Sequence, residues 1–284
     1  MNKLLTITAI ALIASTSFAQ ENELKNFRFG LKVTPSVNWY KPDGKIMAGN
    51  GPGVKFGGGL ILEFRLAKVI SIQTGAQIDM DGGKIAYNNG GRNDAGSNTV
   101  SYYYYNADEK IVKYSPDYAS DPKYTHYQLS ERKYKTTYIT IPFALKMKTK
   151  EIGSLTYFGQ IGINNSFRWK ATADDELNVI NDVTNTLGAK DSKSKIDITK
   201  DMSFYTASLS FGLGAELNLS GSTSITFGLN YNLGFTNVVK SESDYLQRRV
   251  NGTTYPYNPV DFSRSKLPQT IKSNAVVLTV GILF

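Results

Sequence analysis

Cysteine is absent from this 284-residue sequence, and its absence excludes several kinds of structure. The chain forms no disulfide, no thiolate metal site and no lipid-modified N-terminal cysteine. Histidine occurs once, as His126, between two tyrosines. A catalytic base must be held within reach of a nucleophile and oriented by a third group, and the sequence indicates no such group for His126. We therefore expect a solvated histidine and a protein that is not an enzyme.

Long apolar runs are also missing, apart from one at the N-terminus. Lys3 is followed by an apolar run from Leu4 to Ala14, and the segment closes on small residues at Ser17 and Ala19. This order is typical of a secretory signal peptide, whereas a membrane-spanning helix needs ~20 apolar residues. We predict a signal peptide at residues 1–19, removed after Ala19, and an exported domain at residues 20–284.

Signals for nucleic acid, metals and cofactors are missing as well. The formal net charge is +8, yet no basic helix or nucleic-acid module carries it, so we expect no DNA or RNA partner. An acidic stretch in 172–183 lacks the spacing and the glycine of a calcium loop. We interpret it as a solvated loop and expect neither a metal nor a cofactor. The acidic residues of this stretch are Asp174, Asp175, Glu176 and Asp182.

Alternating apolar and small or polar residues dominate the rest of the chain. Between Tyr205 and Leu219 every second residue is apolar, and those in between are Thr, Ser, Gly, Glu or Asn. Since side chains alternate across a strand, one face is apolar and the other small or polar. Eight segments of at least eleven residues follow this pattern, and transmembrane strands need ~9–11. They cover residues 27–39, 54–66, 69–85, 137–147, 155–169, 205–219, 225–236 and 274–284.

The connections alternate between short and long. Tight turns are expected near residues 67–68, 151–153 and 220–221, and long outer loops near 40–51, 86–133, 170–203 and 238–272. We predict an all-β fold: an eight-stranded antiparallel transmembrane barrel of the outer membrane, with short periplasmic turns, long extracellular loops and both termini periplasmic. A soluble barrel would need its apolar face inside, whereas the glycine-rich face here suits a narrow lumen.

Aromatic residues support a membrane location. We expect one set at the periplasmic rim and a second at the outer rim, as lipid headgroups favour. The two sets are Phe27, Phe29, Phe64, Tyr157 and Phe284, and then Trp39, Tyr138, Trp169, Tyr205 and Phe235. The last strand must pair with the first to leave no open edge in lipid. Its final Phe284 resembles the signal that the outer-membrane assembly machinery reads, which makes that machinery an expected partner.

Three segments also resemble a known family. They are "FRFGLKVTPSVNW", "TYITIPFALKMK" and "YFGQIGINNSFRWK". The chain resembles the PorT-like outer-membrane β-barrel proteins of Bacteroidetes. This resemblance implies a Gram-negative outer-membrane barrel, and for its named subgroup a link to type IX protein secretion.

Alternation turns a set of charged residues into the lumen. An eight-stranded barrel is just wide enough to be filled by side chains, so we interpret these residues as an ion-pair network that closes it. The alternative is a narrow small-solute or anion pore, because bases outnumber acids and unpaired buried charge is costly. The predicted residues are Arg28, Lys32, Glu63, Arg65, Lys146 and Glu216 in the periplasmic half, and Lys55, Asp79 and Arg168 nearer the outside.

The long segment 86–133 contains the run Tyr102, Tyr103, Tyr104 and Tyr105. Tyrosine offers a large, rigid contact surface at low entropic cost, so this hairpin is a candidate extracellular binding site for protein, glycan or lipopolysaccharide. Alternatively, it extends the barrel wall and its tyrosines pack on one another. The basic fourth loop, with Arg248, Arg249, Arg264 and Lys266, suits contact with phosphate-bearing lipid.

We therefore predict a structural or interaction protein that acts through its extracellular loops and contacts outer-membrane lipid. The alternatives are the narrow pore and an accessory role in type IX secretion.

Overall fold

The computed structural model describes residues 26–88, 99–184, 186–221, 223–250 and 263–284. The predicted signal peptide lies outside these ranges. Within them the protein consists of β-strands and two short 3₁₀ turns, η1 (Pro116–Ser120) and η2 (Thr199–Asp201). No helix of the described ranges is long and apolar enough to cross a membrane.

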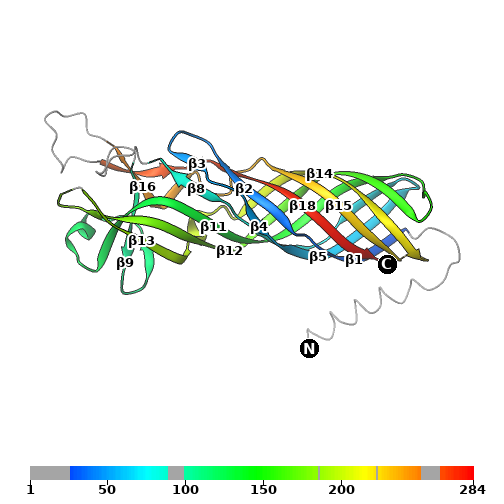
Figure 1. Ribbon diagram of the computed structural model, residues 1–284, viewed down its shortest axis with the longest axis horizontal. Coiled ribbons are helices and arrows are strands. Elements are labelled where there is room, and N and C mark those ends of the chain that lie inside the picture. Colours follow the sequence, from blue (N-terminus) through cyan, green and yellow to red (C-terminus); the bar gives the residue numbers. More distant parts are fainter. Residues whose placement is uncertain (1–25, 89–98, 185, 222, 251–262) are drawn as a thin grey trace.

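Eight antiparallel ring strands close into a barrel, which confirms the predicted fold (Figure 1). Three ring strands are built from consecutive pieces: β1 (Phe27–Val33) and β2 (Ser36–Pro42); β4 (Gly53–Lys55) and β5 (Gly57–Ala67); β6 (Ile70–Thr74), β7 (Gln77–Asp81) and β8 (Lys84–Tyr87). The other five are β11 (Tyr124–Lys148), β12 (Leu155–Asn181), β14 (Tyr205–Ser220), β15 (Thr223–Gly234) and β18 (Ile271–Leu283). The ring closes because β18 pairs with β1, where Val33 lies opposite Val280, and with β2.

Two glycines interrupt the third ring strand. Gly75 has a φ angle of 151° and separates β6 from β7, and Gly82 has a φ of 155° and separates β7 from β8. A Cβ atom at Gly75 would lie 2.1 Å from the Leu60 carbonyl oxygen, and one at Gly82 would lie 2.1 Å from that of Tyr134. Only glycine fits where neighbouring backbone approaches so closely, and the bends let this strand follow the barrel wall.

The barrel is apolar outside and polar inside, the reverse of a soluble barrel. Large apolar side chains are exposed on every ring strand, among them Leu31, Leu60, Ile72, Phe143, Ile161, Leu213, Leu229 and Leu278. Buried polar residues alternate with them, among them Thr34, Ser71, Thr140, Ser210, Thr226 and Asn230. A continuous apolar exterior of this extent is stable only against lipid.

Aromatic pairs mark both borders of this apolar exterior. At the end that carries the tight turns, Phe27 packs on Phe64 at 5.0 Å between ring centres, and Phe29 packs on Phe284 at 5.7 Å. At the opposite border Trp39 packs on Tyr231 at 6.3 Å. The placement of Tyr138 in this rim was wrong: its side chain is 1% exposed and faces the lumen, because it shares the inward parity of β11.

Beyond the apolar exterior, the strands continue into a second body, which we call the cap. Figure 1 shows β11 and β12 running without interruption from the barrel into the cap. The cap also contains β8 and β3 (Met47–Gly49), β9 (Val100–Tyr105), β10 (Lys110–Val112), β13 (Thr186–Asp197), β16 (Glu242–Val250) and β17 (Ser263–Pro268). The segments 86–133 and 170–203, predicted as loops, are therefore largely strands in the described residues.

The cap has its own hydrophobic core. Apart from Ile85, the members named here come from segments that were predicted as long loops, and most are tyrosine or aliphatic. They include Met47, Ile85, Tyr87, Val100, Tyr102, Ile111, Tyr127, Leu129, Leu177, Ile196, Ile198, Met202, Val238, Leu246 and Leu267. A core of this kind makes the cap a packed β-structure that extends the barrel away from the membrane.

Candidate functional site

The turn end of the lumen holds a compact cluster of five charged residues. Arg28 Nη2 lies 2.8 Å from Glu63 Oε1 and 2.8 Å from Glu216 Oε2. Lys146 Nζ bonds the same two carboxylates and lies 4.0 Å from the centre of the Phe158 ring. The structure thus brings together Arg28, Glu63, Lys146 and Glu216, four of the predicted lumen residues.

Lys148 is the fifth member, and the sequence interpretation missed it. Its Nζ lies 2.9 Å from Glu216 Oε1 and also bonds Glu63. Lys148 follows Lys146 by two residues on β11, so its parity was a sufficient signal that it faces inward. It was not included because the predicted strand ended at Met147, one residue earlier, whereas β11 ends at Lys148.

The cluster fills the lumen at its level. Exposed fractions are 2% for Glu63, 2% for Glu216 and 1% for Lys146, so these side chains are shielded from bulk solvent, and Lys146 also borders a small lumen cavity. Three cations surround two carboxylates, and each carboxylate is shared by all three. Buried charges need such close pairing, because desolvation otherwise costs several kcal/mol per ion. This arrangement closes the barrel at its turn end.

The remaining predicted lumen residues lie around or beyond this cluster. Arg65 is half-buried within electrostatic range of Arg28, and Lys32 is within range of Lys146 on one side and Asp79 on the other. Lys55 of β4 is half-buried near Gly82. Arg168 donates a hydrogen bond of 3.4 Å to the Ser203 carbonyl at the base of the cap.

Two small polar cavities occupy the lumen between the ion cluster and the cap. The one nearer the cluster has a volume of about 60 Å³ and is lined by Lys32, Gln160 and Asn230. The one nearer the cap, of about 90 Å³, is lined mainly by hydroxyl and amide side chains. Such polar cavities suit ordered water.

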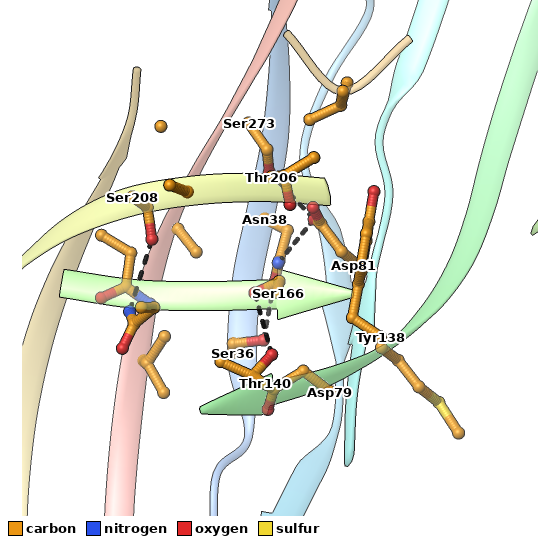
Figure 2. A pocket seen from close by; sticks show the side chains of 18 of the residues that line it. Ser36, Asn38, Asp79, Asp81, Tyr138, Thr140, Ser166, Thr206, Ser208 and Ser273 are labelled. Carbon is orange, nitrogen blue, oxygen red and sulfur yellow. Dashed lines mark hydrogen bonds between the residues drawn. The ribbon is translucent and has the colours of Figure 1, made fainter. Parts of the chain in front are cut away.

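Figure 2 shows the cavity nearer the cap, with Asp81 at its wall. Asp81 accepts hydrogen bonds from Asn38 Nδ2 at 2.8 Å and from Ser273 Oγ at 3.0 Å. Thr140 and Ser166, which also line this cavity, bond each other at 2.9 Å. The carboxylate is satisfied by these donors and by the Gly82 amide, so the cavity wall is a fixed polar network.

The tyrosine run forms β9, in the middle of the cap sheet. β9 pairs with β11 on one side, where Tyr105 lies opposite Tyr124, and with β10 and β16 on the other. Tyr102 and Tyr103 are 0% and 1% exposed, and Tyr104 is 7% exposed; Tyr105 is half-buried and packs on Tyr124 at 5.0 Å. Three of these four residues therefore stabilise the cap. A ligand at this site would contact Tyr105 or the neighbouring exposed Tyr114 instead of the three buried tyrosines.

The centre of the cap holds a buried ion pair. Arg132 donates two hydrogen bonds of 2.7 Å, from Nε and Nη2, to the two oxygens of Asp175, and Tyr102 donates a third at 2.9 Å. Burial lowers the pKa of Arg132, but the Asp175 carboxylate outweighs this and raises it well above its usual value. Burial and then Asp175 raise the pKa of Tyr102, so its hydroxyl stays a donor.

This pair corrects the interpretation of the acidic stretch. Residues 171–181 belong to β12 rather than to a solvated loop, and Asp175 is 2% exposed. The strand pattern was hidden because Asp174 and Glu176 face outward beside the inward-facing Asp175, so charge does not alternate along the segment. No group of three or more potential metal ligands occurs in the part of the chain that the structure describes.

His126 is likewise not a solvated loop residue. It lies in β11, is 5% exposed, and its Nδ1 is 2.8 Å from Asp182 Oδ1. Its ring stacks on Tyr103 at 4.4 Å between centres, and Tyr103 donates a hydrogen bond of 3.0 Å to the same carboxylate. Asp182 is the orienting group that the sequence did not indicate, because it is 56 residues away along the chain.

A closed antiparallel ring with an apolar exterior and a charged, side-chain-filled interior defines a transmembrane β-barrel. The chain belongs to the outer membrane protein beta-barrel domain family, whose family model matches residues 18–240. Membership of this family places the protein in the outer membrane.

Solved structures similar to the chain include three outer-membrane proteins. Neisserial surface protein A is 8% identical, with 92% of this chain and 98% of that chain covered at a TM-score of 0.38. Ail of Yersinia pestis is 10% identical, with 92% and 100% covered and a TM-score of 0.32. OprG from Pseudomonas aeruginosa is 10% identical, with 91% and 95% covered and a TM-score of 0.39. No curated protein sequence matches the chain.

Proposed function

We propose that the protein is a non-enzymatic interaction protein of the outer membrane, in which the barrel is a closed anchor and the cap presents the contact surface. The cap carries this proposal, because it has a hydrophobic core of its own on strands that continue from the barrel. A barrel with a purely structural role in the membrane would not need a separately packed cap. A surface held on long paired strands is preorganised, which favours binding.

We also propose that the cap is extracellular and that the tight turns and both termini are periplasmic. Short turns at one end and long connections at the other support this orientation. It gives the exposed side chains of the cap access to protein or glycan, and the apolar exterior access to outer-membrane lipid. Barrel closure through β1 and β18 further implies handling by the outer-membrane assembly machinery.

The tip of the β9–β10 hairpin allows a sharp test. Tyr105 and Lys110 are direct partners in the β9–β10 ladder, so residues 106–109 can be replaced by a two-residue Asn-Gly turn without removing β10. Cross-linking and pull-down from intact cells should lose their partner with this variant, while heat-modifiable mobility in gel electrophoresis shows that the barrel still folds. A matched control shortens the tight turn at 150–153, at the opposite end. Equal capture by both variants would contradict the proposal.

Maleimide labelling of Lys113→Cys on intact cells tests the orientation separately. The Lys113 side chain is 67% exposed in the cap, so an extracellular cap predicts rapid labelling. Labelling that requires permeabilised cells would contradict this orientation.

The narrow pore is the second candidate, and Lys32 favours it. This residue lines the cavity above the ion cluster and introduces positive charge there. Stable conductance steps in planar bilayers that vanish with Lys32→Gln would support a pore and contradict a closed anchor. The resemblance to PorT-like proteins suggests a third candidate, an accessory role in type IX protein secretion. Co-purification of the protein with secretion components, instead of abundant free protein, would support that role.

A further inference from the structure

Two lysines lie directly opposite each other on the outer surface, at the seam between β2 and β18. Lys41 and Lys272 are Cα partners in this antiparallel ladder, and both side chains are exposed. Direct partners have Cβ atoms ~4.5–5.5 Å apart, so like charges at such positions are destabilising. Among the described residues neither lysine forms a salt bridge, so no directly paired carboxylate neutralises either of them.

The position of this pair relative to the membrane is well defined. Trp39 lies two residues before Lys41 on the same face of β2, and packs on Tyr231 of β15 at the border of the apolar exterior. Two strand residues span ~7 Å, so the lysines lie just outside the aromatic border. Phosphate groups of membrane lipids lie at this level, where the hydrocarbon ends.

A second opposed pair occurs at the same end, on another seam. Lys84 of β8 is the direct partner of Lys133 of β11. This pair is partly neutralised, because Lys84 lies 3.3 Å from Glu131. The Lys41–Lys272 pair differs in having no such acid, which makes it the better anion site.

We propose that Lys41 and Lys272 form a clamp for the phosphate of a phosphorylated lipid headgroup in the adjoining membrane leaflet. Two ammonium groups at cross-strand distance can each donate to different oxygens of one phosphate. The bound anion removes the repulsion between them, while Trp39 and Tyr231 contact the apolar part of the same lipid. A soluble anion would gain nothing from this aromatic pair, so the geometry favours a lipid. In assigning the outer leaflet, this inference rests on the orientation proposed above.

The test compares full-length protein in nanodiscs that contain either bisphosphorylated or dephosphorylated lipid A. Native mass spectrometry counts retained lipid, and the thermal midpoint reports stabilisation. The double variant Lys41→Gln/Lys272→Gln should bind the phosphorylated lipid about 25-fold more weakly, from roughly fivefold per lysine near an anionic surface. The matched variant Lys113→Gln/Lys190→Gln removes the same charge from exposed positions in the cap and should bind as the parent does.

A charge reversal separates binding from stability. Lys41→Glu places opposite charges across the seam, so the lipid-free protein should unfold at the same or a higher temperature. The same variant should lose selective retention of the phosphorylated lipid. Both outcomes together support the clamp, because general damage would lower the midpoint.

Three results would overturn the proposal. Binding that is equal for both forms of lipid A shows that phosphate is not recognised, and unchanged binding by Lys41→Glu excludes the clamp. Displacement of the lipid by millimolar inorganic phosphate identifies a soluble anion site instead. Because nanodisc binding does not depend on which end of the protein faces outward, its failure is distinguishable from a failure of the labelling test of orientation.

Discussion

At the residue scale, the lumen is organised by shared carboxylates. Glu216 and Glu63 each serve Arg28, Lys146 and Lys148, so the removal of one carboxylate leaves three buried cations with a single partner. Breaking a buried ion pair in this way typically costs ~3–5 kcal/mol. The parity of the strands was sufficient to place these residues inside, but only the structure shows which of them touch.

Glu216→Gln tests this arrangement. We expect a loss of about 3 kcal/mol in the free energy of unfolding, measured by urea titration in lipid vesicles, because the amide keeps the shape but removes the charge. The matched control is Gln160→Asn, farther along the lumen, which should lower the free energy of unfolding much less. Asn218→Asp is unsuitable as a control because it adds a charge. A Glu216→Gln variant as stable as the parent would mean that the cluster does not hold the barrel together.

At the element scale, β11 shows what sequence reasoning can reach. Its membrane part was predicted, because Ile139 and Phe143 alternate with small or polar residues. Its cap part was assigned to a loop, because Lys133 and Lys135 face solvent while Arg132 and Thr136 face inward, so both faces are polar. The inward charge is neutralised by Asp175, 43 residues later, and no local pattern reveals such a pairing.

Tyr102→Ala tests the packing of β9. The residue is 0% exposed, and truncation of a large buried aromatic typically costs ~3–5 kcal/mol. Hydrogen exchange should accelerate in β9 and the cap part of β11, while the membrane part of β11 stays protected. Tyr102→Phe keeps the ring and loses only the hydrogen bond to Asp175, so it should cost about 1–3 kcal/mol. Exchange that is unchanged in Tyr102→Ala would contradict a packed cap.

At the scale of the whole molecule, the barrel and the cap depend on different interactions. Lipid and a buried ion cluster hold the barrel, whereas a hydrophobic core and peripheral acids hold the cap. Burial raises the pKa of Asp174, but hydrogen bonds from Lys135 and the Lys195 amide outweigh it and lower the pKa overall. Burial also raises the pKa of Asp191, but hydrogen bonds from Tyr127 and Lys193 outweigh it and lower the pKa overall.

This difference predicts that acid loosens the cap before the barrel. A carboxyl group whose folded-state pKa lies below its usual 3.8 stabilises the fold above that value, and the contribution is lost as the pH falls through the folded-state pKa. Near-ultraviolet circular dichroism of the tyrosines should therefore decline below about pH 4. Asp174→Asn/Asp191→Asn should have a weaker signal at neutral pH and a flatter titration. If the circular dichroism of the parent protein changed with pH in the same way as that of the double variant, these two carboxylates would not explain the acid sensitivity of the cap.

The uninterrupted passage of β11 and β12 from the lipid into the cap has a mechanical consequence. A pull on the cap along the barrel axis moves β11 and β12 together, so it loads in shear the hydrogen bonds that join them to β6, β7 and β14, and many of these must break at once instead of one by one. A force on the cap would thus strain the wall of the barrel before the cap could be separated from it. The same two strands thus carry the cap and anchor it in the barrel wall, so a force on one body passes directly to the other.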